Sequence, residues 1–317
     1  MKKVLLIMMC IVLFAVSAAM GEEQPAGSAP AMPSAPSMPD IDAKFQTVSK
    51  WLNQNNLTVT TSPQQAFVND YILVAAEGLP SPTATSPAKK RLTAERAATT
   101  LAYRQLAEIL EGVAVVGDTL VKDAELQYDV VRVAVSGFVK GARVVQKEYN
   151  EKEESALVIM KIGMTGPGSF ADALYSKILK PDVKKELVEP ESAPKFQPKP
   201  VPVEEKYDGL IIDATEQNFR PALINRIFTP KGEILYDPSK ISQKVLVEQG
   251  CGEYTNSTDK AKAALGTREV KNPLIVKASG TVSPSDLQVS DDDAVKIFSA
   301  NQKAGFLAGA KVAFVLK

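Results

Sequence analysis

Carboxylate side chains are the groups in this sequence that could carry acid-base chemistry. Asp208 and Asp213, with Glu216 close behind, could supply a general acid and a general base. Residues five apart on one extended strand point to opposite faces, so Asp208 and Asp213 could share a substrate only across a bulge. We therefore predict no catalytic residue. The rival hypothesis is a hydrolase that uses carboxylates alone, and it requires these three side chains to meet in one cleft.

The densest run of carboxylates is Asp291, Asp292 and Asp293, which could hold Ca²⁺ or Mg²⁺. Ser290 stands where a helix N-cap belongs, and Asp293 then occupies the third helical position behind it. Acidic side chains in a first turn also interact favourably with the helix dipole. Capping explains all three aspartates. We therefore predict no metal site and no cofactor, with these aspartates as the metal candidates.

Nucleophilic chemistry is restricted because the sequence contains no histidine. This absence removes Ser-His-Asp and Cys-His machinery and the commonest ligand of catalytic zinc. Cys251 is the reactive thiol candidate, and between Gly250 and Gly252 it is either exposed and reactive or a small buried apolar residue. Removal of an N-terminal signal would take Cys10 away, so the mature chain could form no internal disulfide. An intermolecular disulfide through Cys251 remains an alternative.

A glycine-rich stretch at 163–169 stands between a predicted strand and a predicted helix at 170–179. Such a turn can cradle phosphate on free backbone N–H groups. A Walker loop requires a lysine before its serine, but Gly168 occupies that position and Pro167 removes one donor. We predict a plain turn and no nucleotide. Lys and Arg together number 37, as do Asp and Glu, so the chain has no net positive charge that would attract nucleic acid.

The first residues have the pattern of an export signal. Lys2 and Lys3 precede an apolar run, and small residues follow at the positions that a signal peptidase reads, with cleavage after Ala19 or Gly21. We predict a signal peptide at 1–21. Residues 22–42 are rich in Pro, Ala and Ser and poor in large apolar groups, which predicts a disordered tether.

The elements of a first domain, at 43–180, surround one long amphipathic helix. Apolar residues at spacings of three and four predict that it begins at an N-cap, Thr93, and ends at Gly112. Strands at 142–149 and 155–164 should pair antiparallel beneath it. The segment at 125–136 fits a helix or a strand, and we favour a helix.

Three shorter predictions complete this domain. Residues 42–53 should form a helix with Trp51 as a core anchor, and 67–76 a strand. The basic run at 89–91 is placed on a loop before the long helix, where it could contact a membrane surface or simply be solvated.

A proline-rich segment at 181–206 marks a semi-stiff linker between domains. The second domain, at 207–317, should contain a sheet of four or five strands, with strands predicted at 209–214, 222–229, 234–236, 273–282 and 311–316. A turn at 230–233 precedes the third strand, and Ser239 caps a helix or extended arm that reaches Glu248. The predicted fold class is α+β: two small domains, each a mainly antiparallel sheet with packed helices.

Several sequence blocks in the first domain resemble one bacterial envelope family. The family includes small outer-membrane lipoproteins, flagellar-assembly lipoproteins among them, and the N-terminal domain of flagellar assembly protein T. The similarity covers roughly 70–166, and its blocks stand at 73–80, 94–98, 102–108, 112–115, 130–132 and 137–145. The second domain resembles the C-terminal part of longer envelope proteins of this group at 207–214, 220–223 and 230–233. It has Thr215 where a glycine is expected.

The resemblance implies a small α+β domain in the cell envelope with a scaffolding role and no catalytic residue. Lipoproteins of this family carry a cysteine just after the apolar segment, whereas Cys10 lies inside it, so a soluble periplasmic or peripheral form is favoured over a lipid anchor.

We therefore predict a non-enzymatic, exported envelope protein that acts through protein–protein contacts in flagellar or outer-membrane assembly. Its partners would be envelope or flagellar proteins or a second copy of the chain, and peripheral membrane association stays open. The alternative is a periplasmic module that binds a small molecule or glycan, which requires a deep pocket with convergent polar groups.

Overall fold

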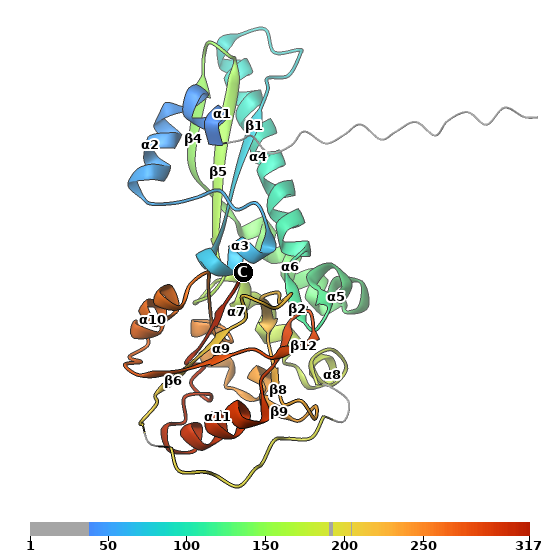
Figure 1. The fold of residues 1–317 in the computed structure, drawn as a ribbon. Coiled ribbons are helices and arrows are strands. Elements are labelled where there is room, and N and C mark those ends of the chain that lie inside the picture. The colour runs from blue at the N-terminus through green and yellow to red at the C-terminus, as the bar shows by residue number, and fades with distance from the viewer. Residues whose placement is uncertain (1–37, 190–192, 204) are drawn as a thin grey trace, which may run out of the picture. The chain divides into compact units, whose positions relative to one another are not determined.

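The computed structural model describes residues 38–189, 193–203 and 205–317. The predicted signal peptide and most of the predicted tether lie outside these residues. The end of the tether, from Met38, belongs instead to the first helix, α1 (Met38–Lys44). The α+β class is confirmed, and helices pack on small sheets in both halves of the chain (Figure 1).

The N-terminal lobe, residues 38–188, contains a three-stranded antiparallel sheet of order β1-β5-β4. Its strands are β1 (Tyr71–Gly78), β4 (Arg143–Asn150) and β5 (Ser155–Gly163), and the predicted hairpin at 142–164 is confirmed. The long helix α4 (Pro87–Glu111) covers one face of the sheet. The helices α1 and α2 (Gln46–Gln54) cover the other (Figure 1). The strands β1 and β5 are thus buried on both sides, whereas β4 is largely exposed, and Trp51 of α2 packs at the edge of the core.

Helix α4 begins earlier than predicted. Ser86 is its N-cap and accepts a hydrogen bond from the backbone N–H of Lys89, while Pro87 occupies the first helical position, where its missing N–H costs nothing. Thr93 is therefore an interior residue, and the basic run at 89–91 lies within the helix and not on a loop. The predicted exit at Gly112 is confirmed.

The remaining helices of this lobe lie around the sheet. The start of the strand predicted at 67–76 is wrong, because α3 (Pro63–Asn69) ends at Asp70 before β1 begins. The favoured helix at 125–136 is confirmed, as the two helices α5 (Val121–Gln127) and α6 (Asp129–Gly141). The helix predicted at 170–179 is α7 (Phe170–Ile178), capped by Ser169.

The C-terminal lobe, residues 193–317, contains a four-stranded sheet of order β10-β14-β6-β11. Every pair in it is parallel, so the antiparallel prediction is wrong for this sheet. Parallel neighbours need crossover connections, and α10 (Thr258–Gly266) and α11 (Asp291–Ala304) lie on such connections. The strands are β6 (Gly209–Asp213), β10 (Glu253–Thr255), β11 (Pro273–Lys277) and β14 (Val312–Val315).

Two smaller sheets complete the fold. One has the order β12-β13-β8-β9, with β8 (Ile227–Phe228), β9 (Ile234–Tyr236), β12 (Gly280–Ser283) and β13 (Asp286–Gln288). The other has the order β3-β2-β7, with β2 (Ala114–Val116), β3 (Thr119–Leu120) and β7 (Ala222–Ile224).

The strand predicted at 222–229 is divided into β7 and β8. Asn225 and Arg226 separate the two pieces because their side chains bond elsewhere: Asn225 accepts the N–H of Ala222, and Arg226 pairs with Asp286. The N-terminal β2 pairs in parallel with the C-terminal β7, and one apolar core runs through both lobes. The two lobes thus share buried apolar residues, and the predicted domain boundaries stay a prediction.

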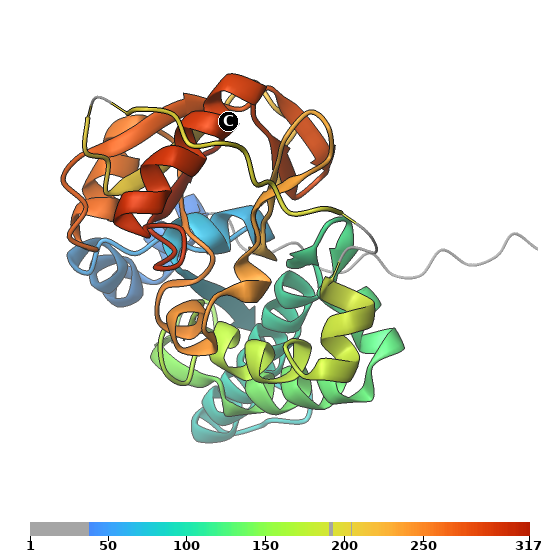
Figure 2. The same cartoon turned by 90° about the horizontal axis from the view of Figure 1, so that it is seen from below.

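The proline-rich segment at 181–206 packs on the protein and is not an extended spacer in its described part. It begins with a short helix α8 (Pro181–Val183) and a π-helical turn, η1 (Lys184–Val188). Phe196 is buried, and its N–H donates to the carbonyl oxygen of Ile234 at 2.9 Å. Further on, the N–H of Val201 donates to Ser299 Oγ on α11 at 3.0 Å. Figure 2 shows this stretch of the chain, in yellow, passing over the red part of the C-terminal lobe.

The helix predicted from Ser239 begins later. Ser242 caps α9 (Gln243–Gln249), while Ser239 lies in a short 3₁₀ turn, η2 (Pro238–Lys240), capped by Asp237. Among the residues that the structure describes, no helix has the length and apolar character needed to cross a membrane.

Candidate functional site

The carboxylates predicted as a possible acid-base set are held apart. Asp208 precedes β6, and its carboxyl accepts the backbone N–H groups of Lys271 and Asn272 at 2.9 and 2.8 Å. Asp213 ends the same strand, about 16 Å further along at the rise of an extended chain. Its carboxyl accepts the hydroxyl and N–H of Thr215, which hold its pKa below the usual range.

Glu216, the third member of that set, pairs with Lys277 at 2.6 Å on the surface. Asp213 and Glu216 both lie near Lys277, whereas Asp208 lies at the other end of the strand. The three carboxyls therefore do not meet in one cleft.

Asp291, Asp292 and Asp293 form the first turn of α11. Ser290 Oγ accepts the N–H of Asp293 at 3.1 Å and donates to its carboxylate at 2.7 Å, which is the predicted capping arrangement. Within the described residues, no group of three or more acidic or cysteine side chains is placed to hold a metal ion.

The glycine-rich stretch at 163–169 forms the predicted turn. The N–H of Gly168 donates to the carboxylate of Asp172 at 2.9 Å, so a side chain of α7 takes the place that an anion would need. The N–H of Gly166 donates to the carbonyl oxygen of Val247 at 2.7 Å, which ties the turn to α9.

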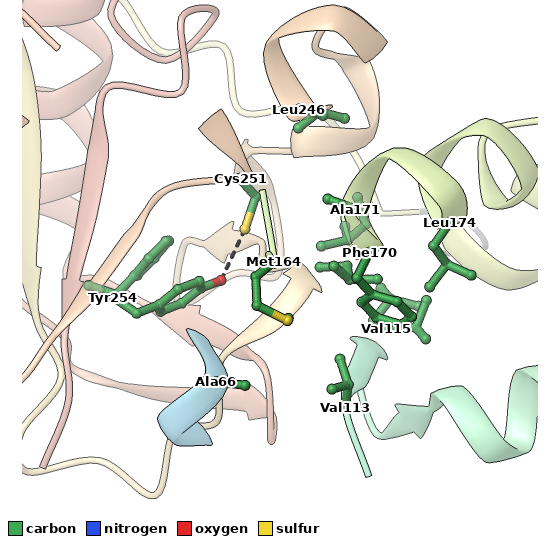
Figure 3. Close-up of a cluster of buried hydrophobic side chains, with 14 of the residues drawn as sticks. Ala66, Val113, Val115, Met164, Phe170, Ala171, Leu174, Leu246, Cys251 and Tyr254 are labelled. Carbon is green, nitrogen blue, oxygen red and sulfur yellow. Dashed lines mark hydrogen bonds between the residues drawn. The ribbon is translucent and has the colours of Figure 1, made fainter. Parts of the chain in front are cut away.

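Cys251 is buried among aromatic and apolar side chains (Figure 3). Its Sγ lies 3.0 Å from the hydroxyl of Tyr254, which also bonds to Asn225 and to the carbonyl oxygen of Ala222. Burial raises the pKa of the Cys251 thiol. Because the thiolate is the nucleophile, the geometry supports the buried alternative and not a reactive thiol.

A cavity of about 310 Å³ opens beside this cluster, where the end of α3 and the turn at 163–169 face the loop between α9 and β10. The polar residues that line it include Asp70, Thr165, Glu253 and Arg268, of which only Thr165 lies in a stretch considered from the sequence, the glycine-rich turn. They come from four separate segments, and no local motif joins them. This cavity has the convergent polar groups that the small-molecule alternative requires.

Asp70 lies at the mouth of the cavity. The residue follows α3 in the left-handed region, with φ at 58°. Its carboxylate accepts the Thr165 hydroxyl at 2.8 and 2.7 Å on its two oxygens. Desolvation of the carboxyl by the surrounding protein atoms raises its pKa, and repulsion by Glu253 raises it further. The hydrogen bonds from Thr165 and the charge of Arg268 lower the pKa, but the net shift is upward.

Arg268 is the cation of the cavity, and its guanidinium already has three protein partners. It donates to the carbonyl oxygens of Ala310 at 2.8 Å and Gln249 at 2.6 Å, and it forms an ion pair with Glu253. Glu248, on the rim, lies 4.0 Å from Lys244. Among the described residues Asp70 has no ion-pair partner, so the carboxylates of the cavity outnumber its cation.

A second feature lies at the outer edge of the N-terminal sheet. The strand β4 is the last in the order β1-β5-β4, so within the described chain one side of its backbone faces no further strand. A groove of about 720 Å³ runs between this strand and α4. Val144 and Val145 are 40% and 42% exposed there, beside the half-exposed Leu92 of α4.

The charges along this groove are unbalanced. Glu95 pairs with both Arg91 and Lys147. Arg96 lines the groove without an ion-pair partner in the described part of the chain, and Arg143, which also has none, begins β4 next to the groove. The groove thus combines exposed valine, an open strand edge and surplus positive charge.

Comparison with known protein families gives a match in the C-terminal lobe. Residues 209–317 match the family model of the second domain of Treponema pallidum Tp0624, which covers about a third of this chain. No curated protein matches the sequence. The C-terminal lobe is therefore similar to a domain of a bacterial protein. The resemblance of 70–166 to flagellar assembly protein T depends on the sequence blocks alone.

Proposed function

We propose that this chain is a non-enzymatic, exported protein of the bacterial cell envelope that acts by binding other proteins, with the edge of β4 as its contact surface. The observation that carries the proposal is the open β4 edge with Val144 and Val145 exposed beside a groove. Soluble proteins usually protect edge strands with charges, prolines or covering elements, since an open edge pairs with other chains.

An extended segment of a partner fits this edge best. Added as a fourth strand next to β4, it would satisfy the free backbone groups and place alternate side chains over the groove. Its apolar side chains would cover Val145 and Leu92. Backbone hydrogen bonds would then supply affinity, and the groove would supply specificity.

The charge of the groove indicates the composition of the partner segment. Arg96 and Arg143 are available to acidic side chains, whereas Glu95 is already neutralised by Arg91 and Lys147. A segment that alternates apolar and acidic residues is therefore favoured over a basic one.

The location is part of the proposal. Lys2, Lys3 and the apolar run that follows support export, and the resemblance at 70–166 supports a periplasmic or outer-membrane-associated position. In its most specific form, the proposal is a role in flagellar or outer-membrane assembly, with an envelope or flagellar protein as the partner.

The edge can be tested by adding a negative charge at its centre. We expect Val145→Glu to reduce co-sedimentation of the protein with the envelope fraction of its own cells by roughly tenfold, because it repels an acidic segment and interrupts the apolar contact. Leu126→Glu is the matched control, since Leu126 is 87% exposed on α5 and away from β4. Equal co-sedimentation of both variants and the unaltered protein would contradict the proposal.

A second candidate function, binding of a small molecule, is favoured by the cavity between Asp70 and Arg268. It does not depend on the β4 edge.

A further inference from the structure

We infer that the cavity lined by Asp70, Phe67 and Tyr254 is a binding site for a small organic amine in its protonated form. The inference concerns a different surface from the β4 edge, so either can fail without the other. It depends on three features of the cavity: its unbalanced charge, its aromatic wall and its enclosed floor.

The charge of the cavity selects a cation. Glu253 and Arg268 neutralise each other, and Arg268 also donates to the carbonyl oxygens of Ala310 and Gln249. Asp70 accepts the hydroxyl of Thr165 but has no ion-pair partner among the described residues. An anionic ligand would be repelled by this carboxylate, and the charge of Arg268 is already paired with Glu253.

The aromatic wall suits an ammonium group. The rings of Phe67 and Tyr254 meet edge to face, with centroids 5.2 Å apart, and both line the cavity. An ammonium group is attracted both to a carboxylate and to the face of an aromatic ring. Asp70 lies three residues after Phe67, so the end of α3 brings the anion and the ring to one side of the cavity.

The floor supplies the apolar part of the site. Tyr175, Leu223 and Ala171 line it, and the hydroxyl of Tyr175 donates to the carbonyl oxygen of Leu223 and does not compete for the ligand. At about 310 Å³ the cavity is at the small end of the range of about 300 to 1,000 Å³ for ligand pockets. A small amine with a compact apolar group fits this volume better than an oligosaccharide.

One backbone feature keeps the wall of the cavity close to the sheet. Gly252 has φ at 156°, and a Cβ there would lie 2.9 Å from the carbonyl oxygen of Val312 and 2.9 Å from the ring of Phe314. Glycine thus lets the loop before β10 approach β14 and present Glu253 and Tyr254 to the cavity.

Protonation of Asp70 should control binding. The groups that face its carboxyl are Thr165 from the turn, Glu253 from β10 and Arg268 from the end of α10, with Glu248 of α9 on the rim. Because its pKa is raised, Asp70 takes up a proton at a higher pH than an ordinary aspartate. The amine should therefore bind above that pKa and be lost as the pH falls through it, with proton release on binding that grows toward one as the pH falls below the pKa.

The experiment uses benzylamine with two ligands of similar shape, neutral benzyl alcohol and anionic benzoate. Binding to the full chain is followed by NMR chemical shifts and by calorimetry at pH 7 and at lower pH. We expect benzylamine to bind roughly tenfold or more tightly than either other ligand, and Asp70→Asn to remove that preference.

Glu248→Gln is the matched control, since it removes the same charge from the exposed rim and should change the affinity by less than about twofold. Phe67→Leu should weaken benzylamine binding and reduce the preference for charge without removing it, because Asp70 remains. Thermal unfolding of each variant shows that it is folded. Equal binding of the three ligands, unchanged benzylamine binding by Asp70→Asn, or no binding up to millimolar concentrations would each overturn the inference.

Discussion

Replacing Asp286 with alanine is expected to lower the free energy of unfolding by about 3 to 5 kcal/mol. Asp286 and Arg226 form a buried ion pair whose side chains are only 3% and 8% exposed. The carboxylate accepts Arg226 Nε at 3.0 Å and Nη2 at 2.8 Å, and it also accepts the backbone N–H of Arg226. Without it, the guanidinium would stay buried with only the carbonyl oxygen of Val188 as an acceptor.

The position of this pair explains why the effect should be global. Arg226 lies at the break between β7 and β8, and Asp286 begins β13, which pairs with β8. Urea unfolding measures the change. The double variant Arg226→Met with Asp286→Leu should recover more than half of the loss, because a buried apolar pair leaves no orphaned charge. A loss below about 1 kcal/mol for Asp286→Ala would show that the guanidinium finds other partners.

Replacing Gly78 with alanine should cost about 3 kcal/mol, at the upper end of overpacking effects. A Cβ at Gly78 would lie 2.2 Å from the backbone nitrogen of Ala98 and 2.5 Å from the carbonyl oxygen of Ala94. The end of β1 therefore touches the backbone of α4 directly. The buried alanines of α4 allow this approach, so a methyl group must push the helix from the sheet.

Gly137 in α6 is the matched control for the same substitution. No atom lies within 4 Å of a Cβ built there, and alanine in the interior of a helix is favoured over glycine by about 0.5 to 1 kcal/mol. Gly137→Ala should thus stabilise the protein slightly while Gly78→Ala destabilises it. Thermal unfolding of the two variants compares them directly. Unfolding midpoints that shift equally in the same direction would show that the β1–α4 contact accommodates the added methyl group.

Local patterns in the sequence predicted many of the elements. The spacing of Ala94, Ala98 and Leu106 identifies the buried stripe of α4, and the β-branched runs around 142–164 identify the hairpin. Ser290 identifies the start of α11. Each of these signals depends only on neighbours along the chain, which is why it could be read directly.

Long-range pairing could not be predicted in the same way. The parallel sheet depends on β6 lying between β14 and β11, which are distant in sequence. A signal was present, because Leu210, Ile211 and Ile212 are all buried, and continuous apolar runs are typical of parallel strands. Phe196 was a similar signal in the proline-rich segment, since one large apolar residue indicated a packing contact.

The cavity was missed for the same reason. Asp70 precedes Glu253 and Arg268 by about 180 to 200 residues and Thr165 precedes them by about 90 to 100, and the contact between the two lobes brings them together. Only Thr165 belongs to a stretch that the sequence singled out, the glycine-rich turn, and nothing in that turn pointed to the other three. The buried state of Cys251 likewise depends on Tyr254 and Asn225, and its glycine neighbours gave no indication of it.

Site-specific photo-cross-linking in the native cell tests the proposed contact most directly. A photoreactive amino acid is placed in turn at Val145 and Lys147 on β4, and at Leu126 on α5 as the control. We predict adducts at both β4 positions and none at Leu126. Mass spectrometry should map the β4 adducts to one extended partner segment of apolar and acidic residues. Adducts that are no more frequent on β4 than at Leu126, or that join β4 to unrelated basic segments, would contradict the proposal.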